Sequence, residues 1–305
     1  YALLQKFGKI VSIQGGFRVD GTFVNPSYLA AYLIFILGFT ILLFADVKKV
    51  WAKIYYAVSA LFTLSIIYFT ASRGPVLGIL IALFLVALIY LFFKKAETDG
   101  DKKNKKILFG GLVAFIVIIS AIWGLKNTDF VKNSKTLSRL TNLSFSETTI
   151  TSRFTIWNMS WQAVKERPLL GWGPENYVTA FSKYYQPELW KQEPWFDRSH
   201  NIIFDWLINA GLLGLLSYLT IFGSALYLLY KNFTENRVSF DKTLIIFGIF
   251  TAYFFQNLFI FDNIATYSSL FALFAYIYSV NKKEEIVLGR DSATVSEYLM
   301  PATIL

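Results

Sequence analysis

The sequence predicts an all-α integral membrane protein: a polytopic helical bundle of about seven transmembrane helices, with an ordered helical loop on its external face. Of its 305 residues, 55% are hydrophobic and only 16% are charged, and the mean hydropathy is +0.48. Soluble domains carry about 25% charged residues, so this composition excludes that class. The high hydrophobicity also excludes an intrinsically disordered chain.

The scarcity of cysteine and histidine limits the kinds of catalytic and metal sites that the chain can form. The chain has no cysteine and a single histidine. This excludes a disulfide scaffold, a thiolate nucleophile and a zinc site built from cysteines or several histidines. The net charge of +9 is compatible with nucleic-acid binding, but most basic residues lie beside the predicted spans. We therefore expect no cofactor, no metal and no nucleic-acid partner.

Seven apolar stretches approach or reach the roughly 17–25 residues that cross a bilayer as a helix. None of them contains Asp, Glu, Lys or Arg. They are residues 27–45, 54–71, 76–93, 107–125, 211–230, 243–261 and 266–280. Four spans therefore lie within 27–125 and three within 200–280, with the long segment 126–199 between them.

Basic residues predict the orientation of these spans. The connections on one side hold twelve Lys and Arg in total; they are residues 46–53, 94–106 and 231–242. The short connections on the other side hold only Arg73. By the positive-inside rule the basic side is cytoplasmic, so the tail 281–305 lies inside and residues 1–26 and 126–199 lie outside. A chain that begins outside the membrane without a signal peptide is expected to be a fragment that lacks upstream spans.

The external segment 126–199 has the composition of an ordered structure. It contains five of the eight tryptophans, which a disordered linker rarely carries. A helix is predicted over 152–167, because four apolar residues recur there at helical spacing: Phe154, Trp157, Trp161 and Val164. A turn at 171–174 precedes a second predicted helix over 174–185, with Pro174 at its first position.

Two arginines are predicted to lie at helix starts on the external side. Arg73 stands just before Pro75, which suits the first position of a helix. Arg153 follows Ser152, a residue type that caps helices. A cation at a helix N-terminus opposes the helix dipole unless an anion lies beside it. Together the two arginines predict a binding site for a phosphate-type anion.

The single histidine, His200, opens the predicted re-entry helix 201–210. A helix N-terminus favours the neutral imidazole, which is the form a general base needs. Three nearby polar residues are candidates for support: Asp197, Asn201 and Asp205. Asp205 either orients His200 or belongs to a polar stripe on a surface helix.

Each of these residues also has a simpler explanation. Arg73 can extend to the membrane interface as a snorkelling side chain. Arg153 can pair with Glu147 or Glu166 on a solvated face. A lone histidine is more often structural than catalytic. The sequence Asp99-Gly100-Asp101 matches a metal-binding DxD pattern, but its lysine-rich surroundings and predicted cytoplasmic side favour plain solvation.

Five segments resemble, in order, those of the O-antigen ligase family, which also includes O-antigen polymerases and protein O-oligosaccharyltransferases. They are residues 21–30 (GTFVNPSYLA), 72–74 (SRG), Arg153 with Trp157 followed by 168–173 (PLLGWG), 199–201 (SHN) and 211–214 (GLLG). The resemblance covers about residues 1–279. The family's further upstream spans have no counterpart, which agrees with a fragment.

The resemblance implies a GT-C-like helical fold and an inverting, metal-independent glycosyltransferase of cell-envelope polysaccharide biosynthesis, lipopolysaccharide included. The implied donor is a glycan on undecaprenyl pyrophosphate, and the implied acceptor is a glycan, lipid A–core or a protein. In that scheme Arg73 and Arg153 bind the pyrophosphate, and His200 activates the acceptor hydroxyl. The site faces the periplasm or cell exterior from the bacterial inner membrane. The alternative, a transporter or flippase for lipid-linked oligosaccharide, is disfavoured because the spans carry no charge.

Overall fold

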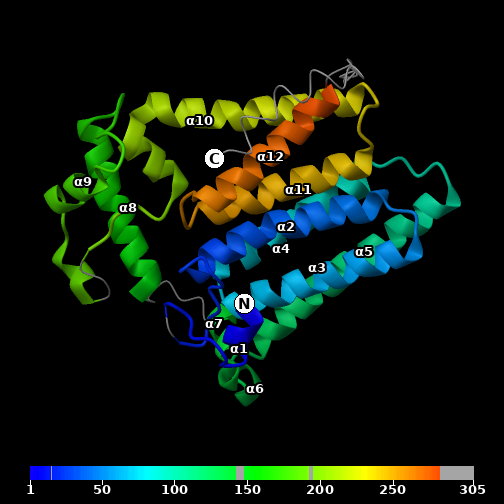
Figure 1. The fold of residues 1–305 in the computed structure, drawn as a ribbon, viewed down its shortest axis with the longest axis horizontal. Helices are drawn as coiled ribbons and strands as arrows, with labels where there is room; N and C mark the ends of the chain where they lie inside the picture. The colour runs from blue at the N-terminus through cyan, green and yellow to red at the C-terminus, as the bar shows by residue number, and fades with distance from the viewer. Residues whose placement is uncertain (15, 142–147, 192–194, 282–305) are drawn as a thin grey trace, which may run out of the picture.

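The computed structural model describes residues 1–14, 16–141, 148–191 and 195–281. Across these residues the regular structure is helical throughout, and no strand occurs. Long helices run side by side as a bundle, and a smaller group that includes α8 and α9 lies at one end of it (Figure 1). The predicted all-helical, polytopic class is confirmed.

Five helices of the described chain are long and apolar enough to cross a membrane. They are α2 (Pro26–Asp46), α3 (Val50–Thr70), α4 (Arg73–Phe93), α5 (Asp99–Gly124) and α10 (Ile202–Thr234). Their positions match the first five predicted stretches, and the protein is a multi-pass membrane protein.

The last two predicted spans are also helices, α11 (Phe240–Asn257) and α12 (Ile264–Asn281), but they are not among these five. Polar residues at both ends of α11 shorten its apolar part, and tyrosines and serines interrupt α12. Length and apolarity alone thus support five of the seven predicted spans, and for α11 and α12 the crossing of the membrane stays a prediction. Both helices pack inside the bundle, where Ile249, Tyr253 and Leu273 are buried with Phe35 and Phe222.

Helix α11 lies against α4 at very short range. A Cβ atom on Gly78 would stand 2.5 Å from the carbonyl oxygen of Ala252, so only glycine permits this approach. One turn earlier, Gly74 lies next to the side chain of Gln256. This contact brings the last turn of α11 beside the first turn of α4.

The basic connections meet at one end of the bundle. Lys242 Nζ lies 2.6 Å from Asp46 Oδ1, which joins the α10–α11 connection to the end of α2. Lys94 Nζ lies 3.5 Å from Asp241 Oδ1, so the start of the α4–α5 connection lies at the same end of the bundle. This arrangement agrees with the predicted grouping of the basic segments on one side. The first turns of α2 and α4 and the last turn of α11 lie at the opposite end.

The remaining helices of the described residues either precede α2 or lie between α5 and α10. They are α1 (Ala2–Lys6), α6 (Asp129–Asn133), α7 (Lys135–Thr141), α8 (Thr148–Glu166), α9 (Tyr177–Lys183) and the 3-10 helix η1 (Pro187–Lys191). The predicted helix over 174–185 is shorter than expected. Gly173 and Glu175 take left-handed backbone conformations, with φ of 94° and 62°, which are incompatible with helix at those residues.

The apolar stripe predicted for α8 is correct only in part. Val164 is buried and Trp157 packs against the same cluster, which also contains Ile156, Met159 and Ala163. Phe154 and Trp161 are exposed. The small side chain of Ala163 lets the α8–α9 loop approach α8 closely. Trp172 Nε1, in that loop, donates a hydrogen bond to the carbonyl oxygen of Ala163 at 2.9 Å. Large aromatic side chains at a membrane surface need not be buried in protein, so their spacing was a poor guide.

Candidate active site

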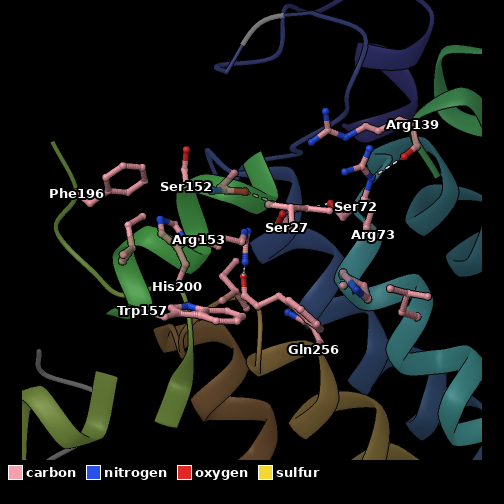
Figure 2. Close-up of a pocket in the computed structure, with 18 of the residues that line it drawn as sticks. Ser27, Ser72, Arg73, Arg139, Ser152, Arg153, Trp157, Phe196, His200 and Gln256 are labelled. Atoms are coloured by element: carbon pink, nitrogen blue, oxygen red, sulfur yellow. Dashed lines mark hydrogen bonds between the residues drawn. The ribbon is translucent and has the colours of Figure 1, made fainter. Parts of the chain in front are cut away.

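A cavity of about 510 Å³ lies at the end of the bundle opposite the basic connections. Its lining includes all three residues singled out from the sequence, Arg73, Arg153 and His200, together with two further arginines, Arg18 and Arg139. Figure 2 shows Arg153 between His200 and the pair formed by Arg73 and Arg139. Segments far apart in sequence thus contribute to one polar cavity.

Arg73 is fixed by the tight turn between α3 and α4. Ala71 ends α3 with a left-handed backbone (φ 49°), and α4 begins at Arg73 itself. Pro75 is therefore the third helical residue rather than the first; its missing N–H costs nothing there, because first-turn N–H groups have no helical acceptor. Arg73 Nε donates to the carbonyl oxygen of Arg139 at 2.6 Å, and Arg139 Nε donates to that of Ala71 at 3.2 Å. These reciprocal bonds hold α7 on the turn.

Arg18 binds the same turn from the N-terminal segment. Its Nε donates to the carbonyl oxygen of Thr70 at 2.8 Å, and its Nη2 donates to Ser72 Oγ at 2.9 Å. Burial, together with the positive charges of Arg139 and Arg73, lowers the pKa of Arg18 to about 10. Sequence reasoning missed Arg18 and Arg139, because neither lies at a predicted helix start; the proximity of Arg18 to the segment 21–30 was the only signal.

Arg153 enters the cavity from α8. It lies in the second turn of that helix, so its predicted place at the helix start is wrong. The stretch before it is rich in Ser and Thr, several of which suit a cap, so the sequence did not define the first residue. Its Nη1 donates to the carbonyl oxygen of Phe259 in the α11–α12 connection (Figure 2). Burial, together with the positive charges of Arg139 and Arg73, lowers the pKa of Arg153 to about 10.

The four guanidinium groups therefore lie in one another's electrostatic field. Like charges gathered in a partly dehydrated cavity repel one another. An anion placed among them would relieve this repulsion and accept their planar, bidentate hydrogen bonds. The arrangement suits a phosphate or diphosphate.

His200 is held by its neighbours in an unusual backbone conformation, with φ of 51°. Such a conformation in a non-glycine residue persists where the surroundings enforce it. On one side, Trp157 Nε1 donates to the carbonyl oxygen of Ser199 at 3.1 Å. On the other, Asn201 caps α10 through Ile203 N (2.9 Å) and donates from Nδ2 to the carbonyl oxygen of Leu258 (3.0 Å). Asn201 thus positions the histidine.

The imidazole of His200 lies between two aromatic rings. Its ring centre is 5.7 Å from that of Phe196, nearly perpendicular to it, and 5.5 Å from that of Phe261. Burial lowers the pKa of His200 to about 4, and the positive charge of Arg153 acts in the same direction, while Asp197 opposes them. The imidazole is therefore neutral at pH 7.

The acidic residues near the site have other partners. Asp205 Oδ2 accepts from Arg198 Nη1 at 3.2 Å, and Arg198 Nη2 donates to Glu175 Oε1 at 2.6 Å. The carboxylate of Asp205 thus pairs with Arg198. Asp197 is exposed and acts on His200 through its charge alone.

Two other acidic residues were predicted as possible partners of Arg153. Glu166 accepts instead from Lys183 Nζ and from the hydroxyl of Tyr184, each at 2.7 Å. Glu147 lies outside the described residues.

Asp262, in the α11–α12 connection, is a partly buried acid that sequence reasoning missed. Its carboxylate accepts from the hydroxyl of Tyr253, from Asn257 Nδ2 at 2.5 Å and from the hydroxyl of Tyr218 at 3.2 Å. These bonds fix the connection whose Phe259 carbonyl binds Arg153 and whose Phe261 ring packs on His200. An acid in a short external connection without basic neighbours was the available signal.

The DxD-like sequence has a structural role at the far end of the bundle. Asp101 Oδ2 accepts from the backbone N–H of Thr98 at 3.0 Å, while Thr98 Oγ1 accepts from Asp101 N at 3.1 Å. This reciprocal capping box starts α5. Among the residues that the structure describes, no group of three or more His, Asp and Glu is placed to hold a metal ion.

A model of the family described as O-antigen ligase matches residues 58–219, just over half of the chain. The matched range contains Arg73, Arg139, Arg153 and His200, whereas Arg18 lies before it. The comparison with curated proteins gives no match.

Proposed function

The chain belongs to the O-antigen ligase family, and we propose that it transfers a glycan from undecaprenyl pyrophosphate to an acceptor hydroxyl. Membership indicates a membrane glycosyltransferase of the ligase or polymerase type. One observation carries the finer proposal: Arg73, Arg153 and His200 line the same cavity, together with Arg18 and Arg139. An anion site and a neutral base are thereby adjacent.

The arginines are proposed to bind the diphosphate of the donor. Guanidinium groups match phosphate oxygens with paired hydrogen bonds. Fixed positive charge stabilises the negative charge that develops on the leaving diphosphate. Because arginines supply this charge, we propose a metal-independent reaction, and transfer should persist in EDTA. The cavity lies at the ends of α2 and α4, where a lipid diphosphate can reach it while its chain stays in the bilayer.

His200 is proposed as the general base. The acceptor oxygen attacks the anomeric carbon while its proton passes to an imidazole nitrogen of His200. The bond from the anomeric carbon to the diphosphate oxygen breaks, and undecaprenyl pyrophosphate leaves. Attack from the face opposite the leaving group inverts the anomeric configuration. A positioned base contributes roughly 10²–10⁴-fold to such a step.

Donor binding also changes the pKa of the proposed base, His200. In the empty site the positive charge of Arg153 helps to depress the pKa of His200, and an imidazole with a pKa of about 4 is a weak base. A bound diphosphate offsets that charge, so the pKa of His200 should rise toward its ordinary value. The base thus becomes stronger when the donor is in place.

The proposed orientation follows from the basic connections. If their side is cytoplasmic, the cavity faces the periplasm or cell exterior of the bacterial inner membrane. There the acceptor is a growing glycan, lipid A–core or a protein. The competing function is transport of the same lipid-linked oligosaccharide, which requires an alternating pathway at mid-membrane rather than a site at one end of the bundle.

Reconstituted protein distinguishes the two functions. Vesicles containing wild-type protein or His200→Gln receive a labelled undecaprenyl-pyrophosphate glycan, with and without acceptor, and both transfer and translocation are measured. We expect acceptor-dependent release of undecaprenyl pyrophosphate by wild type and its loss in His200→Gln. Translocation that is unchanged in His200→Gln, with no transfer by either protein, would instead establish a transporter.

A further inference from the structure

The loop between α8 and α9 is joined to a break in α10. Gly211 interrupts this helix, with φ of 65° and ψ of −163°. The freed N–H groups find acceptors in the loop: Leu212 N donates to the carbonyl oxygen of Pro168 at 2.8 Å, and Leu213 N to that of Leu169 at 3.3 Å. These bonds fix the loop at the level of Leu212 on α10.

Two leucines at the tip of this loop are exposed. Leu169 is 61% and Leu170 is 72% accessible. The adjoining surface of α10 also exposes leucines, at Leu212, Leu213 and Leu216. Because α10 is apolar and long enough to span the membrane, its exposed leucines face acyl chains, with which they are chemically matched. The loop therefore extends a lipid-facing surface.

The length of α10 gives the depth of this surface. About 19 residues separate Leu212 from Lys231, which corresponds to a rise of roughly 28 Å. The hydrocarbon core is about 30 Å thick. With Lys231 at the basic boundary, Leu212 reaches the opposite boundary of the hydrocarbon, and residues 168–171 lie beside it.

The residues that flank the loop are typical of the headgroup level. Arg167 stacks on the ring of Trp172, with Cζ 4.4 Å from the ring centre. Lys183 also lies over this ring, at 5.6 Å, and pairs with Glu166. Arginine, lysine and tryptophan concentrate at membrane interfaces. Charged groups thus surround Trp172, while Leu169 and Leu170 remain uncovered.

We propose that residues 168–171 form a membrane-inserted loop, with Leu169 and Leu170 among the acyl chains of the leaflet on the cavity side. From the sequence, segment 126–199 was predicted only to be an external loop, without a membrane-inserted part. Insertion fixes the depth of α8, which carries Arg153, relative to the bilayer. The proposal requires only that the chain spans the membrane and is independent of the reaction.

Spin labelling tests the insertion directly, because the chain has no cysteine of its own. Single nitroxides are attached in Leu170→Cys, in Leu216→Cys as the lipid reference and in exposed Ser182→Cys as the water reference. The full chain is reconstituted in vesicles of phosphatidylethanolamine and phosphatidylglycerol. Collision with oxygen, which concentrates in acyl chains, is compared with collision with a water-soluble nickel complex.

We expect the oxygen-to-nickel ratio at position 170 to be several-fold above that at position 182 and close to that at position 216. A label in Leu169→Cys provides a second, independent measurement. A ratio at both loop positions equal to that at position 182 would overturn the proposal. Shielding from both reagents would also overturn it, since it would indicate a protein partner or a second copy of the chain.

Discussion

Gly171, in the loop after α8, and Gly211, at the break in α10, lie backbone against backbone. Both have left-handed φ values, 69° and 65°, and a Cβ on Gly171 would stand 2.7 Å from the nitrogen of Gly211. Next to them, Trp172 N donates to the carbonyl oxygen of Ile208 at 2.6 Å. The PLLGWG and GLLG segments are thus two halves of one unit that joins α8 and α9 to the bundle.

Replacing Gly211 with alanine should strongly destabilise the protein. The new Cβ would stand 2.5 Å from the nitrogen of Leu170, and the backbone at φ 65° and ψ −163° is one that essentially only glycine adopts. Over-packing costs about 1–3 kcal/mol, and the strained backbone adds about 1–3 kcal/mol. Thermal unfolding in detergent measures the loss.

Gly223→Ala is the matched control for this prediction. Gly223 lies in the same helix, and a Cβ there would meet nothing within 4 Å. Alanine is favoured over glycine inside a helix by about 0.5–1 kcal/mol, so the control should unfold at the same or a slightly higher temperature. Equal unfolding temperatures for the two variants would contradict the close packing.

Arg153→Lys should weaken donor binding. Lysine keeps the charge but loses the planar fork and the bond to Phe259. Loss of a charge-assisted hydrogen bond corresponds to roughly 10- to 100-fold in affinity. Titration calorimetry with a soluble undecaprenyl-pyrophosphate analogue measures the change.

Arg237→Lys is the matched control for Arg153→Lys. Arg237 also donates to a backbone carbonyl oxygen, that of Asn281, but it lies at the other end of the bundle. Equal affinity in both variants would leave Arg153 with a structural role only.

The orientation of the bundle is testable with single cysteines. Lys103→Cys reports the basic end and leaves the Thr98–Asp101 cap intact; Ser182→Cys reports the cavity end. In intact cells an impermeant thiol reagent should label position 182 and spare position 103, which should react only after the membrane is opened. Labelling of position 103 in intact cells would reverse the assignment and place the cavity inside.

Hydrophobicity predicted the helices well but not their contacts. A span must satisfy its own backbone hydrogen bonds and bury apolar side chains, and both requirements are visible in one segment of sequence. The break at Gly211 needs carbonyl acceptors from Pro168 and Leu169, which the local sequence does not reveal. The same holds for α8, whose buried face is set by Trp172 and α9 rather than by its own aromatic residues.

The site was predicted in part for a related reason. Arg73, Arg153 and His200 stand next to helix signals, so the sequence singled them out, although Arg153 proved to lie in the second turn of its helix. Arg18, Arg139 and Asp262 reach the site through backbone carbonyls and buried hydroxyls of distant segments. Such partners exist only after folding, and no local pattern indicates them.

The pH dependence of transfer should identify His200 as the base. Its pKa in the empty site is lowered to about 4, first by burial and then by Arg153, so the imidazole is neutral and active above that pH. The parameter kcat/KM reports the free protein and should fall only as pH drops through about 4. The donor diphosphate offsets Arg153 and raises the pKa of His200, so kcat should begin to fall at a higher pH than kcat/KM.

The variant His200→Gln should lose roughly 10²-fold or more in kcat, and its kcat should not fall at acidic pH in this way. Unfolding temperatures measured at each pH separate titration from acid denaturation. Retention of most activity by folded His200→Gln would make His200 a positioning residue, and the proton acceptor would then be sought in Asp197, Asp205 or Glu175.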